Sequence, residues 1–319
     1  MTVSNHPHTS TADVKRTVRQ SVLNATLRHI VKRRLRSVPV ILEAIIKLRA
    51  EINTLAGRFL RTNEDAAIVQ DVLADVPVER IRPLEASGRV VLYIHGGAFM
   101  FCSPVTHRGI TLPLASRTRC EVIAVAYRLA PEHPYPAAVN DSLAVYLNLL
   151  ETIPAHDITL AGDSAGGNLV LALLHTLKDK GLPMPSSAVC LSPVTDLSGG
   201  SDSIRQNIES DVLLPGERMH ELARLYINGA YVREPAVSPV FGDFTGFPPL
   251  LFHVGDSEIL LDDSRRAVAR ARSCGVEAHL RIWPNLPHVF HAFSSHLPVA
   301  FDALEEIAEF MVVQFQRPL

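Results

Sequence analysis

The chain has 319 residues, of which 47% are hydrophobic and 20% charged, so it is long enough to bury a large core. Its formal net charge of -2 provides no electrostatic reason for it to bind nucleic acid or a strongly charged substrate. No segment approaches the roughly 20 apolar residues of a membrane span, which argues against stable insertion into a bilayer. Composition therefore favours a globular protein whose partner is a neutral, fairly apolar small molecule.

The N-terminal residues 1–12 are rich in Ser, Thr, His and Pro, and we expect them to be mobile. They contain no apolar stretch of the kind that a secretory signal requires. The four cysteines lie far apart, with neither a Cys-x-x-Cys pair nor the spacing of a metal site: Cys102, Cys120, Cys190 and Cys274. The simplest expectation is a cytoplasmic protein with inert buried thiols and no bound metal.

Two helical stretches are predicted before the first convincing strand, at about 13–35 and 38–60. In the second, apolar residues recur every three or four positions, which is typical of an amphipathic helix that covers another surface. We therefore interpret this stretch as part of a lid. The first stretch carries a basic cluster between Arg28 and Arg36, which a solvated helix face explains. Attraction to a membrane surface is the alternative interpretation.

From about residue 78 onward, short β-rich segments alternate with longer helical ones. Strands are predicted at 78–84, 89–94, 121–126, 157–161, 187–191, 249–254 and 278–283. Helices are predicted near 107–118, 137–151, 165–179, 262–274 and 299–315. Such alternation implies a mostly parallel sheet with helices on both faces and chemistry at the carboxyl ends of its strands. The fold class is therefore α/β.

One segment, 196–247, interrupts this alternation between two core strands. It contains Ser, Gly, Asp and Pro turns around a modest helix from Glu217 to Tyr226. We interpret it as the second half of a helical cap, whose first half comprises residues 1–60. The α/β core then consists of residues 61–195 and 248–319.

The most informative motif is Gly-Asp-Ser-Ala-Gly-Gly at 162–167, which lies between a short apolar segment and a helical one. A strand, a tight turn and a helix would present Ser164 Oγ clear of the backbone. Gly162 and Gly166 lack the Cβ atoms that would prevent the chain from closing around this turn. Upstream, His-Gly-Gly-Ala-Phe at 95–99 directly follows another apolar segment, as an oxyanion loop would. The two motifs together predict a hydrolase that acts by acyl transfer.

A serine hydroxyl is a weak nucleophile at neutral pH, so Ser164 needs a base within hydrogen-bond reach and a carboxylate to orient that base. Among the 14 histidines, only His288 combines a late position, a loop after a strand and a following helix. His291 is the nearest rival. A metal site formed by these two histidines is a weak alternative, because no third ligand has supporting spacing.

Four acidic residues follow the predicted strand 249–254: Asp256, Glu258, Asp262 and Asp263. Asp262 and Asp263 are typical of the first turn of a helix, where carboxylates act as caps. Spacing alone does not distinguish the remaining two, so Asp256 and Glu258 both stay candidates for the carboxylate that orients the base.

Four motifs together resemble those of the bacterial hormone-sensitive-lipase-like esterases of the α/β-hydrolase fold. They are His95 to Ala98, Tyr127 to Glu132, Gly162 to Gly167 and His288, and the likeness extends from about residue 85 to 315. In that family the catalytic acid commonly opens an Asp-Pro-Leu-x-Asp-Glu segment. Matching its trailing acids to Asp262 and Asp263 implies that Glu258 is the acid, with Asp256 kept in reserve. The chain departs from the pattern by having Glu where Asp is commoner, and so resembles a subgroup with a Ser-Glu-x-Leu-Leu-Asp-Asp segment.

Main-chain N–H groups without bulky neighbours are expected to form the oxyanion hole, because they permit close approach to a negative oxygen. These donors are the N–H groups of Gly96, Gly97 and Ala165. His95 is expected to brace the loop by hydrogen bonding. Asp163 should point away from the hydroxyl of Ser164, and in the similar esterases its position is structural. The segment from Tyr127 to Pro134 is likewise expected to be a rigid structural loop.

The implied reaction requires no cofactor. Phe99 and Met100, with Phe101 and the apolar N-terminal helices, are expected to line a hydrophobic substrate pocket beneath the cap. The resemblance implies esters with short- to medium-chain acyl groups as substrates. Lactones and terpene esters are the main alternative, and an amide substrate or a non-catalytic receptor on the same fold are the others.

The last predicted strand, 278–283, belongs to a segment that alternates in polarity from Glu277 to Trp283, as an exposed edge strand does. The family resemblance implies that this edge pairs with its copy in a homodimer. The expected partners are therefore a small-molecule ester and a second copy of the chain, and not nucleic acid.

Overall fold

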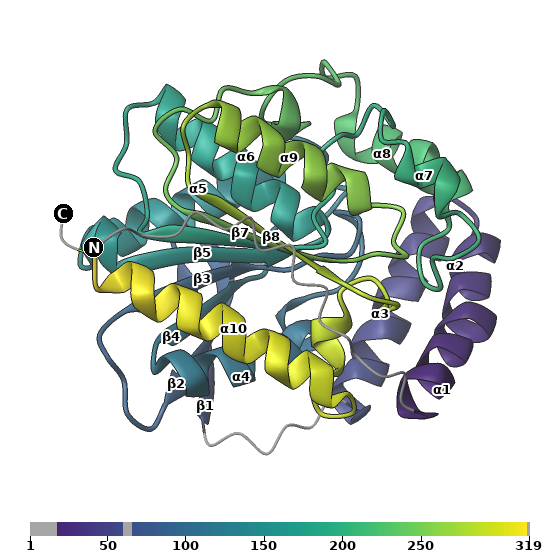
Figure 1. Cartoon of the computed structure of the whole chain (residues 1–319), viewed down its shortest axis with the longest axis horizontal. Helices are drawn as coiled ribbons and strands as arrows, with labels where there is room; N and C mark the ends of the chain where they lie inside the picture. Colours follow the sequence, from purple (N-terminus) through teal and green to yellow (C-terminus); the bar gives the residue numbers. More distant parts are fainter. Residues whose placement is uncertain (1–17, 60–65, 318–319) are drawn as a thin grey trace, which may run out of the picture.

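The computed structural model describes residues 18–59 and 66–317. An eight-stranded sheet forms its centre, in the order β1-β2-β4-β3-β5-β6-β7-β8 (Figure 1). The strands are β1 Ala66–Leu73, β2 Val76–Pro83, β3 Val90–Ile94, β4 Glu121–Val125, β5 Ile158–Asp163, β6 Ser187–Leu191, β7 Leu250–Gly255 and β8 Ala278–Trp283. Neighbours from β4 to β8 pair in parallel, whereas β2 pairs antiparallel with β1 and β4. The predicted α/β class with a mostly parallel sheet is confirmed.

Helices cover both faces of the sheet. The long helices of the core are α4 Arg108–Thr118, α5 Ala137–Leu150, α6 Ala165–Asp179, α9 Leu261–Ser273 and α10 Pro298–Phe315. Figure 1 shows α5, α6 and α9 on one face, with α4 and α10 on the other. The buried strand residues divide accordingly: Leu92 belongs to the apolar cluster of the first face, and Val91 and Tyr93 belong to that of the second. Alternate residues of a strand point to opposite faces, so a strand between two helical layers must be apolar throughout.

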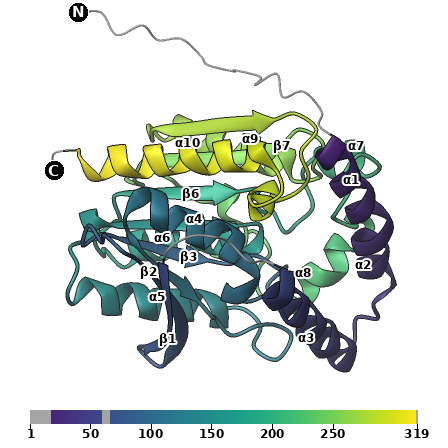
Figure 2. The same ribbon diagram turned by 90° about the horizontal axis from the view of Figure 1, so that it is seen from below.

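The remaining α-helices of the described residues, and one π-helical turn, gather at one end of the sheet. They are α1 Val18–Thr26, a π-helical turn Leu27–Lys32, α2 Arg33–Ser37, α3 Leu42–Phe59, α7 Ser203–Gln206 and α8 Met219–Ile227. Figure 2 shows them beside the ends toward which the parallel strands point. The predicted helices at 13–35 and 38–60 correspond to these N-terminal elements, and residues 1–12 lie outside the described part. No helix within residues 18–59 or 66–317 is long and apolar enough to cross a membrane.

Among the described strands, β1 is the one that the sequence pattern did not indicate. It pairs with β2 through a two-residue turn at Ala74 and Asp75, whose φ angles are 48° and 62°. Two positive φ angles are typical of a type I′ turn, which usually contains Asn or Gly. Most residues of β1 are exposed, so the alternation of apolar and polar residues that reveals a half-buried strand is missing.

The segment 196–247 has two structurally different parts. Its first part contains α7 and α8 and lies at the same end of the sheet as the N-terminal helices (Figure 1). Its second part returns to the core: Val240 donates a main-chain hydrogen bond to Thr195, and the ring of Phe244 packs edge-on to His175 of α6 at 5.2 Å. The helix predicted from 217 to 226 is α8, preceded by a 3-10 turn at Gly216–Arg218.

Candidate active site

Ser164 lies at the sharp turn between β5 and α6. Its backbone has φ 52° and ψ -118°, a conformation that is strained for a residue with a side chain. The chain can close here because a Cβ on Gly162 would lie 2.6 Å from the carbonyl oxygen of Gly166. A Cβ on Gly166 would collide with the carbonyl oxygen of Ile94. The predicted strand, turn and helix are therefore present at this serine, and the two glycines are sterically required.

His288 and Glu258 form a buried pair in the loops that follow β8 and β7. Nδ1 of His288 lies 2.7 Å from Oε2 of Glu258, and the two residues are 4% and 0% exposed. The other carboxylate oxygen, Oε1, accepts hydrogen bonds from Ser192 Oγ at 2.7 Å and from the N–H of Gly255 at 2.6 Å. Because both carboxylate oxygens have partners, Glu258 holds the imidazole of His288 in one orientation.

The pKa of His288 is raised above its ordinary value. Burial by itself lowers this pKa, because the interior solvates an imidazolium poorly. The hydrogen bond and negative charge of Glu258 outweigh burial, with further contributions from the charges of Asp211 and Asp163. The site thus stabilises the protonated imidazole, which is the state that a general base reaches during nucleophilic attack.

Ser164 and His288 both line a cavity of about 390 Å³. Its wall is largely apolar, and much of it comes from the two segments that gather at the end of the sheet. The N-terminal segment contributes Val31, Leu35, Val38, Ile45, Leu48 and Ile52, and the segment 196–247 contributes Leu213, Leu214, Met219 and Leu222. The apolar face predicted for the stretch 38–60 is therefore directed at this cavity.

Asp163 organises the loop that follows β3. Its Oδ1 accepts the main-chain N–H of Gly96 at 3.0 Å and the hydroxyl of Tyr93 at 2.7 Å. Its Oδ2 lies 3.1 Å from Nε2 of His107, and the negative charge of Asp163 raises the pKa of that histidine despite its burial. Since the N–H of Gly96 already has an acceptor, it is not available to a substrate oxygen. This corrects the prediction of Gly96 as an oxyanion donor, and Asp163 has the structural role expected of it.

Gly97 and Ala98 both line the cavity. Their φ angles are 111° and 53°, and a Cβ on Gly97 would collide with the carbonyl oxygen of Phe101. Among the hydrogen bonds of the described residues, neither N–H has an acceptor. Ala165 opens α6, and the first N–H groups of a helix have no intrahelical acceptor. These three N–H groups have no acceptor among the described residues and belong to the segments that flank Ser164.

Phe99 and Met100 were both expected to contact substrate, and the structure separates them. Phe99 lines the cavity and stacks on Tyr226, with ring centroids 3.6 Å apart. Met100 is fully buried in the apolar core and is not among the lining residues, which corrects the prediction for this residue. Phe101 lines the cavity instead. The positive φ angles of Ala98 and Phe99 change the direction of the chain, so strand-like alternation does not continue through this loop.

The rival residues have other partners. Asp256 is exposed and accepts the main-chain N–H of Asn285 at 2.7 Å, so it stabilises the loop before His288 without touching that imidazole. His291 is fully buried, and its Nε2 lies 3.3 Å from Nδ1 of His253. It is not among the residues that line the cavity.

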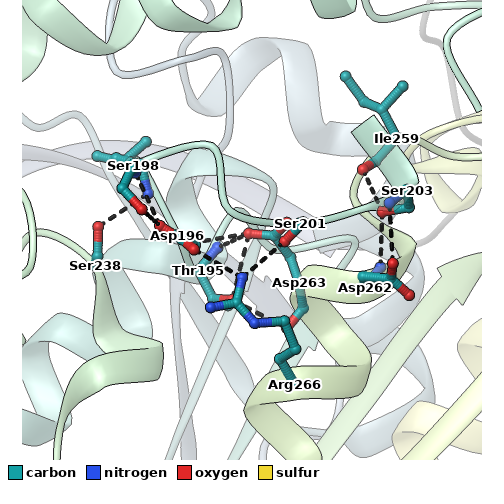
Figure 3. A network of polar contacts seen from close by, with 11 residues as sticks. Thr195, Asp196, Ser198, Ser201, Ser203, Ser238, Ile259, Asp262, Asp263 and Arg266 are labelled. Atoms are coloured by element: carbon teal, nitrogen blue, oxygen red, sulfur yellow. Dashed lines mark hydrogen bonds and ion pairs between the residues drawn. The ribbon is translucent and has the colours of Figure 1, made fainter. Parts of the chain in front are cut away.

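Asp262 and Asp263 open α9, as expected, and bind the segment that follows β6. Asp262 accepts the N–H of Ser203 at 2.9 Å, and Asp263 accepts the N–H groups of Thr195 and Asp196 at 2.6 and 2.9 Å. Figure 3 shows both carboxylates turned toward these main-chain groups. Their role in the structure is to hold the segment 195–203 against the start of α9.

Sequence reasoning missed Ser192, His107 and Asp211. Ser192 directly follows β6 and has φ 47°, which places its Oγ against Glu258. Its position at the carboxyl end of a parallel strand was a usable signal. His107 and Asp211 gave no such signal, because neither directly follows a strand of the sheet.

An elbow serine and a histidine–carboxylate pair beside an apolar cavity, all at the carboxyl ends of parallel strands, define a protein of the α/β-hydrolase class. Residues 91–292 match the family model described as alpha/beta hydrolase fold. The chain therefore belongs to this family.

Comparison with named relatives shows which kind of α/β-hydrolase this chain resembles. The chain is 41% identical over 236 residues to an acetyl-hydrolase of Streptomyces hygroscopicus, covering 73% of this chain and 78% of the relative. It is 42% identical over 240 residues to an esterase of Acinetobacter venetianus, covering 75% and 79%. A crystal structure of an esterase from the bacterial hormone-sensitive lipase family has a TM-score of 0.87 and 34% identity, covering 95% of this chain and all of that one. The protein is accordingly a carboxylic ester hydrolase related to the bacterial hormone-sensitive lipases.

Proposed function

We propose that Ser164 is the nucleophile of this esterase, His288 its general base and Glu258 the carboxylate that orients the base. Ser164 Oγ attacks the ester carbonyl while His288 Nε2 takes its proton, and the same nitrogen then protonates the departing alcohol. Water hydrolyses the acyl-serine through the reverse proton transfers. The observation that carries this proposal is the buried 2.7 Å contact between His288 and Glu258 beside the strained Ser164.

Three main-chain N–H groups are proposed to stabilise the negative oxygen of the tetrahedral intermediate: those of Gly97, Ala98 and Ala165. Gly97 and Ala165 were expected from the sequence, and Ala98 takes the place of Gly96. The hydrogen bond from Gly96 to Asp163 supports this choice, because it fixes the loop while leaving the next two N–H groups free. Each such donor is worth about 3 to 4 kcal/mol in the transition state.

The proposed substrates are neutral carboxylic esters with short- to medium-chain acyl groups. An apolar cavity of about 390 Å³ favours a small uncharged ligand, and its size lies at the lower end of the ordinary range for ligand sites. The name of the Streptomyces relative, an acetyl-hydrolase, agrees with a short acyl group. Phe99 and Phe101 are proposed to contact the substrate beside Ser164.

The test is hydrolysis of p-nitrophenyl esters from acetate to palmitate by the wild type and by Ser164→Ala, His288→Ala and Glu258→Ala. Asp256→Ala is the matched control, since this carboxylate lies in the same loop without touching His288. We expect activity on the shorter chains that is lost in the first three variants and retained in the control. Loss of activity in Asp256→Ala but not in Glu258→Ala would contradict the assignment of the acid. A preference for palmitate would contradict the proposed acyl length.

The domain organisation is proposed on the same basis. The sequence predicted a cap of residues 1–60 and 196–247 and a core of 61–195 and 248–319. Within the described residues, the proposed cap comprises the helices of 18–59 and the part of 196–247 that contains α7 and α8, and the later part of that segment belongs to the core. The helices α3 and α8, which supply the cavity wall, support the cap in the described part of the chain. We also propose a cytoplasmic location, for which the four free cysteines are the support, because reducing compartments keep thiols unpaired.

A homodimer through β8 is the remaining proposal. This strand is the last in the order of the described strands, where its neighbour is β7, so its other side is an edge of the sheet. Pairing of two such edges would continue the sheet across a two-fold axis. Light scattering across a range of concentrations tests it: a dimer mass supports the proposal, and a monomer mass at all concentrations contradicts it.

A further inference from the structure

The basic cluster between Arg28 and Arg36 is not simply a solvated helix face. Arg34 forms an exposed ion pair with Glu51 at 3.1 Å, as a surface arginine often does. Lys32, in contrast, is only 4% exposed, although it lies at the end of the π-helical turn Leu27–Lys32 on the outside of the fold. A buried ammonium group requires good partners, because leaving water is costly for a charge.

The partners of Lys32 belong to the segment between β6 and β7. Its Nζ donates to the carbonyl oxygen of Ile208 at 2.9 Å and to that of Asp211 at 2.6 Å. Two distant parts of the chain, separated by more than 170 positions, are thus joined by one buried side chain. Lys32 fixes the position of Asp211 relative to the N-terminal helices.

The carboxylate of Asp211 connects the cavity wall with the loop of the proposed acid. Its Oδ1 accepts the N–H groups of Leu213 and Leu214, both at 2.8 Å, and these two residues line the cavity. Its Oδ2 accepts the N–H of Ile259, the residue after Glu258, at 3.0 Å. Asp211 is 1% exposed, so these are interior hydrogen bonds that water does not replace easily.

Neighbouring side chains of the same segment hold the peptide groups around Glu258. Asn207 Nδ2 donates to the carbonyl oxygen of Glu258 at 2.7 Å, and Ser203 Oγ donates to that of Ile259 at 2.7 Å. Figure 3 shows Ser203 between Ile259 and the start of α9. The acid loop is therefore held by the segment 203–211, whose far end is attached to Lys32.

We propose that Asp211 is a positioning residue for the catalytic acid and that Lys32 sets it in place, so that the cap and the Glu258–His288 pair keep one relative geometry. This inference rests on the proposed function of that pair. A second contact supports it: Gln20 of α1 donates to the carbonyl oxygen of Asn285 at 2.7 Å, three positions before His288. The N-terminal helices thus reach the loops of both members of the pair.

The charge of Asp211 also affects the pKa of His288, which a purely structural residue would not do. His288 is faced by the negative charges of Glu258, Asp211 and Asp163, all of which raise its pKa. Lys32 is faced by Asp211, Arg36, Glu217 and Glu209. Removing the charge of Asp211 lowers the pKa of His288, so the acid limb of the kcat/KM profile moves to lower pH. Removing Lys32 leaves the charge of Asp211 in place and produces no such shift.

The experiment compares Asp211→Asn, Lys32→Met and the control Arg33→Met in the full chain. Arg33 is the neighbouring exposed residue and has no ion pair among the described residues, so the control matches Lys32→Met in chemistry and position. Steady-state kinetics on p-nitrophenyl butyrate, the pH profile and circular dichroism melting are measured for each. We expect kcat to fall about 10- to 100-fold in the first two variants, with little change in KM, because a small misplacement of a catalytic group has this effect.

The outcomes distinguish a failure of the proposed esterase function from a failure of the positioning role of Asp211 and Lys32. A wild type without ester turnover contradicts the proposed function itself. An active wild type, with folded Asp211→Asn and Lys32→Met variants within twofold of its kcat, overturns the positioning role alone. An acid limb that stays in place in a folded Asp211→Asn variant also overturns it. If Asp211→Asn does not fold, Lys32→Met against Arg33→Met decides: a loss of kcat confined to Lys32→Met supports the inference, and equal kcat contradicts it.

Discussion

Two pairs of buried side chains contain histidine, and the histidine pKa is shifted in opposite directions in the two pairs. His288 contacts Glu258 at 2.7 Å, and its pKa is raised. His253 and His291 contact one another at 3.3 Å, and burial lowers the pKa of both. All three imidazoles are almost completely inaccessible to solvent, so burial alone does not explain the difference. In this comparison, a carboxylate within hydrogen-bond distance decides whether the pKa of a buried histidine is raised or lowered.

The neutral pair has a definite hydrogen-bonding pattern. Trp283 Nε1 donates to His253 Nδ1 at 3.3 Å, so this nitrogen is an acceptor and His291 Nε2 must carry a proton to donate to it. His291 Nδ1 then has no partner among the described residues. The nearest carboxylate, Glu306, is 3.7 Å from His253 Nε2, which is too long for a hydrogen bond. The charge of Glu306 therefore does not overcome the effect of burial on His253.

The largest effect should come from removing the base. His288→Ala leaves Ser164 without a proton acceptor, and kcat should fall by about 10⁶-fold, as in other serine hydrolases that lose this group. Hydrolysis of p-nitrophenyl butyrate measures it. His291→Ala is the matched control and should retain activity, since this imidazole does not line the cavity. Comparable losses of kcat in His288→Ala and His291→Ala would contradict the different roles of these two histidines.

The carboxylate should be the next most important group. Glu258→Gln keeps the shape but removes the charge, so the favoured tautomer of His288 changes and kcat should fall by about 10⁴-fold. The pKa of His288 should also fall, because Glu258 is the group that offsets burial. The pH profile of the residual activity measures this shift. An acid limb at the wild-type pH would mean that Glu258 does not set the pKa of His288.

Removing the hydrogen bond from Ser192 to Glu258 should have a smaller effect on kcat. Ser192→Ala removes the hydrogen bond to Oε1 of Glu258 but leaves the N–H of Gly255 in place. A hydrogen bond to a charged group is worth ~1.5 kcal/mol, so kcat should decrease about 10-fold. Ser192→Cys, which keeps a weak donor without a β-branched side chain at this positive φ, is the control and should retain more activity than Ser192→Ala. Equal activity of wild type and Ser192→Ala would show that Gly255 suffices.

The smallest effect on activity, and a distinct effect on stability, is expected for His291→Leu. The pKa of His291 in the folded protein is well below its value near 6.5 in the unfolded chain, so the unfolded chain binds more protons and stability falls as pH drops below about 6.5. The leucine variant should lose stability less steeply over this range, by up to about 1.4 kcal/mol per pH unit. Urea unfolding at several pH values measures the slope.

In the same experiment, His288 should change the pH dependence of stability in the opposite direction. Its raised pKa contributes stability that is present below about 6.5 and is lost as pH rises through the folded-state value. His288→Leu should therefore change the slope above 6.5, where His291→Leu has no effect. Identical slopes in the wild type and His291→Leu below 6.5 would mean that His291 is protonated in the folded protein.

Much of the fold could be predicted because it depends on local sequence patterns. The apolar segment 90–94 predicted a strand buried on both faces, and β3 is one. The glycines at 162 and 166 predicted the turn at Ser164, because only residues without Cβ fit there. Strand β1 was missed because its exposed surface lacks alternation and its turn uses Ala74 and Asp75 in place of Asn or Gly. Hydrophobic sequence patterns therefore predict elements that bury at least one face, and they do not predict exposed elements such as β1.

The sequence by itself determined the α/β order, the elbow serine and the late histidine, because chain order and local sterics constrain them. Spacing alone did not distinguish Glu258 from Asp256, and only the family resemblance favoured Glu258. The sequence also assigned Gly96 and Met100 to roles that their contacts exclude. Those decisions depend on which groups meet across the fold: Asp163 takes the N–H of Gly96 from 67 positions away. The same holds for Lys32, a member of an apparently solvated cluster that becomes a buried link to Asp211. Hydrogen bonds and burial between distant segments are properties of the tertiary structure, since no local period or spacing encodes them.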